Sequence, residues 1–243
     1  MITVFPFGFH ATLLGRNHAL WFHFSRRLKN KPNHVTYYAR RAPYYDELYA
    51  KPERQHDLTT LGAYLKTALA DKKVLEIACG TGYWTQVIAQ TATTVHATDI
   101  NEPMLEIARE KPYPRDNVVF EACDMYDLMP GGGFDALFGG FIWSHIPLQE
   151  LEAWLNHLHG LLKPGSKVVF TDNNFVPGSS TPITSPDDQG NIFQQRKLPD
   201  GQEYLVIKNF PELPDFERLL KKQGRNILLR NLEHYWMLEY DLA

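Results

Sequence analysis

The sequence predicts an α/β fold with a doubly wound, mostly parallel sheet. From Lys72 onward, short apolar runs alternate with segments whose apolar residues recur at helical spacing. Strands that alternate with helices form parallel βαβ units, and right-handed crossovers place the helices on both faces of the sheet. The expected strands are Lys73–Cys79, Thr94–Ile100, Asn117–Asp124, Phe134–Phe141 and Ser166–Thr171. The expected helices are Tyr83–Thr91, Glu102–Lys111 and Pro147–Leu162.

The regular alternation ends after Asp172. Residues 173–191 are rich in Pro, Ser, Thr and Asp, which predicts a loop. The next two extended runs flank Pro199-Asp200-Gly201, a sequence typical of a hairpin turn. We therefore expect a β-hairpin inserted at about residues 191–210. Beyond it, the pattern predicts a helix at Leu213–Gln223 and two final strands at Asn226–Leu232 and Tyr235–Leu242.

The composition is that of a folded globular protein. The chain has 243 residues, of which 44% are hydrophobic and 22% are charged, and these values exclude collagen-like and disordered classes. Its two cysteines, Cys79 and Cys123, are too few for a disulfide framework or a cysteine-based metal site. No run of about 18 apolar residues is present, so no transmembrane segment is expected. Because the start lacks the features of a secretory signal, the expected location is cytoplasmic.

Charge is distributed unevenly along the chain. The formal net charge is −3, yet the first acidic residue is Asp46 and seven Lys or Arg residues precede it. Residues 46–243 therefore carry 18 basic and 28 acidic residues. Such an acidic body repels phosphate, so nucleic acid is not an expected partner. We expect residues 1–33 to be an N-terminal extension and residues 34–243 to form the functional domain, with two helices between residues 36 and 70.

The sharpest motif is Glu76-Ile77-Ala78-Cys79-Gly80-Thr81-Gly82-Tyr83, which joins the first expected strand to a helix. Gly80 and Gly82 allow a tight turn and a close approach of the backbone to a ligand. Dinucleotide-binding loops run Gly-x-Gly-x-x-Gly, but Thr85 occupies the third glycine position here. Glu76 also places a carboxylate inside the strand. A pyrophosphate has no use for that charge, whereas a cationic ligand such as a sulfonium amino acid tolerates or favours it.

Two further acidic residues end the second and third expected strands. Asp99 lies 19 residues after the first glycine of the loop, where a carboxylate accepts hydrogen bonds from two ribose hydroxyls. Sites for NAD and for S-adenosylmethionine (SAM) share this feature. Asp124 is placed to accept from an adenine amino group, or alternatively to cap the following turn. Ile100, Met104 and Met125 are candidates to cover the adenine ring, and ordinary core packing is the alternative for the two methionines.

These segments resemble the class I SAM-dependent methyltransferases, in the broad branch that includes small-molecule enzymes. The resemblance extends over about residues 37–173. It implies SAM as the cofactor and a Rossmann-like sheet of seven strands in the order 3-2-1-4-5-7-6, with the last strand antiparallel. The similar segments are Val74–Thr85 for the first motif, Thr98–Asn101 for the ribose-binding motif, Ala122–Leu128 for the adenine-binding segment and Leu161–Asn173 for the fifth strand. The first of these departs from the family pattern at Ala78, where a glycine often stands.

The resemblance also implies roles for individual residues in binding SAM. Backbone carbonyls near Ala78 and Phe141 are expected to hold the ammonium group. The loop Gly80-Thr81-Gly82 is expected to lie under the methionine portion. By the same resemblance, Asp99 holds the ribose, and Asp124 with Met125 holds the adenine.

The N-terminal helices often form a lid in this family. The segment around Tyr38 and Arg41 is dense in aromatic residues, and these two are our candidates for binding the SAM carboxylate. The alternative is that both belong to the surface packing of an amphipathic helix.

Methyl transfer from a sulfonium mainly requires that the acceptor, the methyl group and the sulfur be aligned. A general base helps when the acceptor is a hydroxyl or a protonated amine. His145, after the fourth strand, is the candidate catalytic base because histidine titrates near neutral pH. The alternatives are that His145 lines the pocket or fixes the turn before Pro147. Trp143 is a candidate to stack on a flat acceptor, or to pack against the N-terminal helices.

Asp172, Asn173 and Arg196 are the other candidate substrate contacts. Metal-dependent catechol-type methyltransferases place an Asp-Asn pair at the end of the fifth strand together with an Asp after the fourth. No acidic residue lies between Asp135 and Glu150, so that ligand is missing and no metal is expected.

The sequence thus predicts a SAM-dependent methyltransferase that transfers a methyl group to N or O of a small-molecule acceptor. A methyltransferase of tRNA or protein, an NAD(P)-linked reductase and a non-catalytic SAM-binding protein remain as alternatives.

Overall fold

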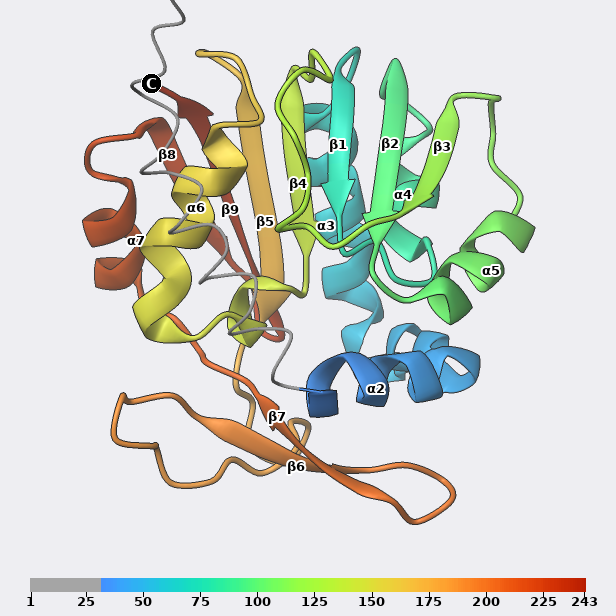
Figure 1. Cartoon of the computed structure of the whole chain (residues 1–243), viewed down its shortest axis with the longest axis vertical. Helices are drawn as coiled ribbons and strands as arrows, with labels where there is room; N and C mark the ends of the chain where they lie inside the picture. Colours follow the sequence, from blue (N-terminus) through green and yellow to red (C-terminus); the bar gives the residue numbers. More distant parts are fainter. Residues whose placement is uncertain (1–31) are drawn as a thin grey trace, which may run out of the picture. The chain divides into compact units, whose positions relative to one another are not determined.

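The computed structural model describes residues 32–243. A seven-stranded sheet in the order β3-β2-β1-β4-β5-β9-β8 forms its centre (Figure 1). Strands β1 to β5 are parallel, β9 pairs antiparallel with β5, and β8 pairs antiparallel with β9. The predicted strand order is therefore confirmed. The strands are β1 Lys73–Ile77, β2 Thr94–Asp99, β3 Val118–Ala122, β4 Ala136–Gly140, β5 Lys167–Asn173, β8 Gly224–Asn231 and β9 Tyr235–Leu242.

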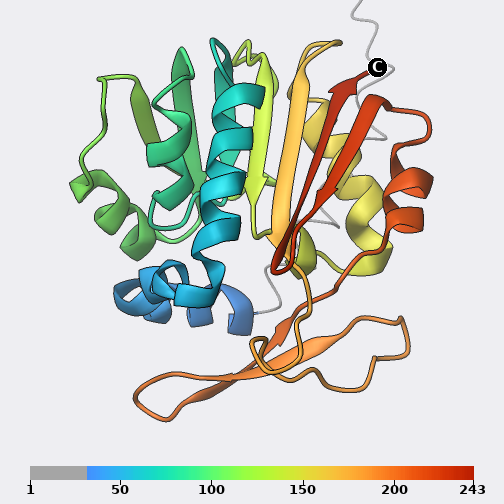
Figure 2. The ribbon, with the colours of Figure 1, turned by 180° about the vertical axis from the view of Figure 1, so that it is seen from behind.

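Helices cover both faces of this sheet. Helices α3 and α4 lie on one face and α6 lies on the other, as Figure 2 shows from behind. This is the arrangement that right-handed βαβ crossovers require. The α-helices are α2 Pro32–Arg41, α3 Gln55–Ala68, α4 Tyr83–Ile88, α5 Glu102–Glu110, α6 Leu151–His159 and α7 Leu213–Leu220. The short 3-10 helices are η1 Ala42–Ala50, η2 Pro52–Arg54, η3 Trp143–His145 and η4 Leu148–Glu150.

Proline accounts for the main differences from the expected helices. The region between residues 36 and 70 holds α2 and α3, with η1 and η2 between them. Pro43 and Pro52 stand in the first turns of η1 and η2, where no N–H group is needed for a hydrogen bond within the helix. In the middle of one long helix the same prolines would break the hydrogen-bond pattern, so the region is divided into separate helices. The helix expected from Pro147 begins instead as the short η4, and α6 starts at Leu151.

The expected hairpin is present as β6 (Phe193–Lys197) and β7 (Glu203–Ile207). The two strands pair antiparallel, and Gly201 in the turn has a φ of 87°, a conformation that glycine adopts without strain. Figures 1 and 2 both show the hairpin and α2 beyond the same end of the main sheet, the carboxyl end of its parallel strands. Ligands of open α/β sheets bind at this end.

The N-terminal extension expected over residues 1–33 lies almost entirely outside the described residues. Within the described part, no helix is long and apolar enough to cross a membrane.

Candidate active site

The loop between β1 and α4 has a backbone that suits close contact with a ligand. Gly80 and Gly82 both adopt left-handed conformations, with φ values of 57° and 76°. A Cβ atom at Gly82 would lie 2.6 Å from the Tyr113 hydroxyl and 3.0 Å from the Ala108 Cβ atom. The glycine is therefore required both by the turn and by the packing of α5 against the loop.

Two non-glycine residues at this end of the sheet share the left-handed conformation. Ala78 follows β1 with a φ of 51°, and Phe141 follows the neighbouring strand β4 with a φ of 59°. Such conformations cost about 1–3 kcal/mol each and persist where the surrounding structure imposes them, often at functional sites. Both lie where the sequence resemblance places the carbonyls for an ammonium group.

Asp99 ties the end of β2 to the glycine loop. Its carboxylate accepts a hydrogen bond from the Gly80 N–H at 2.9 Å and one from the Asn101 N–H at 2.8 Å. The side chain is 7% exposed, and burial raises its pKa although these N–H groups act in the opposite direction. Next to it, Ile100 is 46% exposed, so its side chain is available to cover a ligand ring.

Asp124, the third acidic candidate, forms a hydrogen bond within its own turn. The Asp124 carboxylate accepts from the Tyr126 N–H at 3.1 Å and so caps the following turn, which was the alternative interpretation. The Met125 carbonyl accepts from His157 Nε2 at 3.0 Å. Met104 is 2% exposed on the inner side of α5 and belongs to the core. The expectation that Met104 covers the adenine ring finds no exposed surface in this structure.

Glu76 is a buried carboxyl with an unpaired atom. It is 1% exposed, and its Oε2 has no hydrogen-bond partner among the described residues. Burial raises the pKa of Glu76 to about 8, and the nearby Asp99 acts in the same direction. A carboxyl kept in this state beside a glycine loop fits a cationic ligand, because a positive charge would favour the ionised form.

The 3-10 helix η1 covers the glycine loop. The Tyr45 ring lies 3.8 Å from the position of a Cβ at Gly80. Asp46 accepts from the Thr81 hydroxyl and forms an ion pair with Lys111, with 2.5 Å between Nζ and Oδ2. Asp46 was not identified from the sequence, because nothing in a spacing of 35 residues indicates a contact with Thr81.

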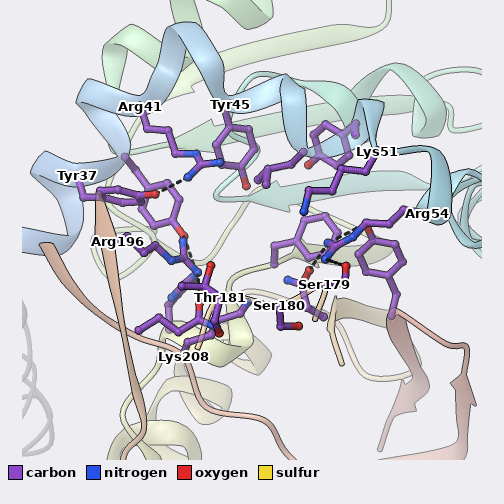
Figure 3. A pocket seen from close by; sticks show the side chains of 18 of the residues that line it. Tyr37, Arg41, Tyr45, Lys51, Arg54, Ser179, Ser180, Thr181, Arg196 and Lys208 are labelled. Carbon is purple, nitrogen blue, oxygen red and sulfur yellow. Dashed lines mark hydrogen bonds between the residues drawn. The ribbon is translucent and has the colours of Figure 1, made fainter. Parts of the chain in front are cut away.

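A cavity of about 330 Å³ opens beside Phe141, between α2, η1, the end of β5 and the hairpin (Figure 3). Of the predicted site residues, Tyr38, Arg41, Phe141, His145, Asn173 and Arg196 line it. The sequence did not identify Lys51, Arg54 or the segment Ser179–Thr181, which complete one side of the cavity. No motif marks them, since Lys51 and Arg54 lie at the two ends of the short η2 segment and residues 179–181 lie in a loop without periodic pattern.

His145 is held by hydrogen bonds at both ring nitrogens. Nδ1 lies 2.6 Å from the Ile207 carbonyl oxygen and must donate to it, which leaves Nε2 to accept from the Tyr38 hydroxyl at 2.8 Å. The Tyr38 oxygen in turn accepts from Arg196 Nη1 at 2.8 Å. Burial holds the pKa of His145 well below its ordinary value, and nearby His34, Lys208 and Arg196 add to this effect. His145 is therefore neutral at pH 7.

Two predicted substrate residues do not line the cavity. Trp143 is 1% exposed and packs in the core against Trp154 and Phe170. It has no open face on which an acceptor could stack, because η3 turns its ring inward. Asp172 is 0% exposed and forms an ion pair with Lys208 at 2.7 Å. It also accepts from the Ser144 N–H at 2.9 Å, so it joins β5 to the hairpin and to η3.

Comparisons with known proteins agree with this geometry. Residues 74–165 match the family model described as "Methyltransferase domain". The solved structure of the DhpI complex with S-adenosylhomocysteine (SAH) superposes with a TM-score of 0.68, at 25% identity, and the match covers 87% of this chain and 96% of that one. The chain is a class I SAM-dependent methyltransferase. Its cofactor is SAM, and the alternative of an NAD(P)-linked reductase is set aside.

Two curated relatives of this chain are also named as methyltransferases. The chain is 25% identical over 212 residues to "Malonyl-[acyl-carrier protein] O-methyltransferase 2" of Ilyobacter polytropus, with 80% of each protein covered. It is also 25% identical over 168 residues to an "Uncharacterized methyltransferase" of Anoxybacillus flavithermus, covering 68% of this chain and 76% of the relative.

Proposed function

We propose that this methyltransferase transfers a methyl group from SAM to an oxygen or nitrogen atom of a small-molecule acceptor by in-line displacement. The cavity beside Phe141 carries the proposal. Its volume of about 330 Å³ is that of a small-molecule site, and both the lid and the hairpin border it. An O-methyltransferase among the relatives favours oxygen as the atom that is methylated.

The chain's own residues bind the cofactor in this proposal. Asp99 accepts from the ribose hydroxyls, and Asp124 with Met125 contacts the adenine. The carbonyls near Ala78 and Phe141 accept from the ammonium group. The strained backbone at these two positions supports that role, because it is imposed at adjacent strand ends.

The lid residues complete the cofactor site in the proposal. Arg41 and Tyr38 bind the carboxylate; Arg41 lines the cavity, and the Tyr38 hydroxyl donates to the carboxylate only when it turns away from His145 Nε2. When bound, SAM supplies an electrophilic methyl group. The remaining task of the protein is to hold the acceptor in line with that group and to exclude water, which can lower the barrier by about 7–11 kcal/mol.

His145 is the proposed base for an acceptor that must lose a proton. It is neutral and therefore able to accept one, but its Nε2 already accepts from the Tyr38 hydroxyl. In the proposal, a proton that leaves the acceptor reaches His145 through Tyr38, which also lines the cavity: the Tyr38 oxygen takes it up as its own hydroxyl proton passes to His145 Nε2.

The proposal is tested by incubating the full chain with SAM and measuring SAH formation. The acceptors are a panel of small hydroxy acids, dicarboxylic acids, phenols and amines, with total tRNA and a mixture of unmodified proteins as competing classes. We expect SAH formation with at least one small-molecule class. SAH formation with tRNA or protein alone would contradict the proposal, and SAH binding without turnover on any class would favour a non-catalytic SAM-binding protein.

A further inference from the structure

The cavity has an unusually one-sided charge. Six of its lining residues are Lys or Arg, and no lining residue is Asp or Glu. This contrasts with residues 46–243 as a whole, which carry more acidic than basic residues. A cluster of one sign in an acidic body concentrates positive potential at this single place. The basic residues are Arg41, Lys51, Arg54, Arg196, Lys197 and Lys208.

Most of this charge has no partner. Within residues 32–243, only Lys208 among the six forms an ion pair, the one with Asp172. The Nε atoms of Arg41, Arg54 and Arg196 are buried and have no hydrogen-bond partner in the described chain. Each of the three guanidinium groups donates through an Nη atom to an uncharged side chain, but a buried Nε–H group without an acceptor is destabilising. Three such groups around one cavity indicate a site built for an anion.

Arg54 provides the firmest part of this site. It is 7% exposed, and its Nη2 donates to the Ser179 hydroxyl at 3.1 Å while the guanidinium lies 5.6 Å from the centre of the Tyr235 ring. The Ser179 hydroxyl also contacts the Glu53 carboxylate at 3.3 Å, but Glu53 forms no ion pair with Arg54 among the described contacts. The Arg54 guanidinium is thus fixed in orientation, and no ion pair among the described residues offsets its positive charge.

Arg196 provides a second fixed cation from the hairpin. Its Nη1 donates to the Tyr38 hydroxyl at 2.8 Å and its Nη2 donates to Gln194 at 2.9 Å. The guanidinium also lies 5.6 Å from the centre of the Tyr37 ring. Figure 3 shows Arg196 and Arg54 approaching the same cavity from different sides, with Ser179, Ser180 and Thr181 beside them.

The cofactor does not account for this charge. The SAM carboxylate is a single negative charge, and Arg41 is the residue proposed for it. With Lys208 paired to Asp172, four basic residues then remain beside the cavity that we assign to the acceptor: Lys51, Arg54, Arg196 and Lys197.

We propose that the acceptor carries an oxyanion, a carboxylate, phosphate or phosphonate group, which Arg54, Arg196 and Lys51 bind. This proposal rests on the proposed function, since it specifies the acceptor of that reaction. Guanidinium groups bind such anions through paired, charge-assisted hydrogen bonds. The serine and threonine hydroxyls of residues 179–181 supply further donors to its oxygen atoms.

The test measures binding by calorimetry in the SAH-loaded full-length protein. The probes are glutarate and propylphosphonate, with glutaramide as the uncharged counterpart of glutarate. We expect at least one of the two anions to bind about tenfold or more tightly than glutaramide, and its affinity to fall as the salt concentration rises. Whichever of the two anions binds more tightly distinguishes a carboxylate acceptor from a phosphonate-like one.

Variants locate the site. Arg54→Gln and Arg196→Gln should each lower the affinity for the anion by about tenfold or more while SAH affinity stays unchanged. Arg54→Lys should lose less anion affinity than Arg54→Gln. Arg218→Gln, an exposed residue of α7, is the matched control and should bind like the wild type. The proposal is overturned if glutaramide binds as well as both anions, or if the two arginine variants bind the anion like the control. Absence of SAH binding would instead contradict the proposed function.

Discussion

The Tyr38 hydroxyl donates a hydrogen bond to His145 Nε2 at 2.8 Å and links α2 to η3, the short helix that follows β4. The Ile207 carbonyl fixes the other nitrogen of His145 from the hairpin at 2.6 Å. One histidine therefore connects the lid, the sheet and the insertion. It lines the cavity together with its tyrosine partner, and both of its ring nitrogens are engaged in hydrogen bonds.

This relationship predicts how the two side chains behave when mutated. His145→Ala should lower turnover by about a hundredfold or more, the usual range for loss of a positioned base, and leave SAH affinity unchanged. If the proton passes through Tyr38, the double variant with Tyr38→Phe should be no slower than the more damaged single variant. Unchanged turnover in His145→Ala would remove the base role, and additive losses would remove the relay.

Glu76 predicts an unusual dependence of stability on pH. Its pKa is about 8 in the folded state and about 4.3 in an unfolded chain, because burial penalises the ionised form. Between these values the folded protein holds a proton that the unfolded chain has released. The free energy of unfolding should therefore fall as the pH rises from about 5 to 8.

Denaturant titrations of the SAM-free protein and of Glu76→Gln, at pH 5 to 9, measure this effect. The variant should gain stability relative to the wild type as the pH rises, by a few kcal/mol at most. Other titrating groups are common to both proteins and cancel in the difference. Parallel stability curves would show that Glu76 is ionised in the folded state throughout this range.

The buried pair of Lys208 and Asp172 predicts a large structural effect. Burial alone would raise the pKa of Asp172, but the Lys208 ammonium and the Ser144 N–H hold it below its ordinary value. Lys208→Met would leave this carboxylate buried without a counter-charge, so it should lower the free energy of unfolding by about 3–5 kcal/mol.

Adding Asp172→Asn to Lys208→Met removes the unpaired charge and should restore part of the loss. Equilibrium unfolding of the two variants in urea makes the comparison. A loss below about 1 kcal/mol in the single variant would mean that the pair contributes little to joining β5 and the hairpin.

Features fixed by local pattern were predicted well from the sequence. The strands that form the sheet follow short apolar runs between turn residues, and the hairpin follows from its Pro199-Asp200-Gly201 turn. The glycine loop is likewise local, since its two glycines mark positions of positive φ. In each case the residues that determine the structure are neighbours in the chain.

Features that depend on packing over long distances were not predicted. Trp143 was a candidate for the acceptor site, but its ring packs against Phe170 of β5 and Trp236 of β9, which lie far from it in the sequence. Arg54 went unnoticed because its partners, Ser179 and Tyr235, are more than a hundred residues away. Periodicity and motifs carry no information on such contacts.

The central claim is that Asp99 and the glycine loop bind the SAM-type cofactor of a methyltransferase. Calorimetric titration of SAH into the full chain and into Asp99→Ala tests it most directly, with circular dichroism to confirm that both are folded. We predict binding at one site in the wild type and an affinity lower by about tenfold or more in Asp99→Ala, because the variant loses the carboxylate that receives the ribose hydroxyls. No heat of binding in the folded wild type, or equal affinity in the two proteins, would contradict the account.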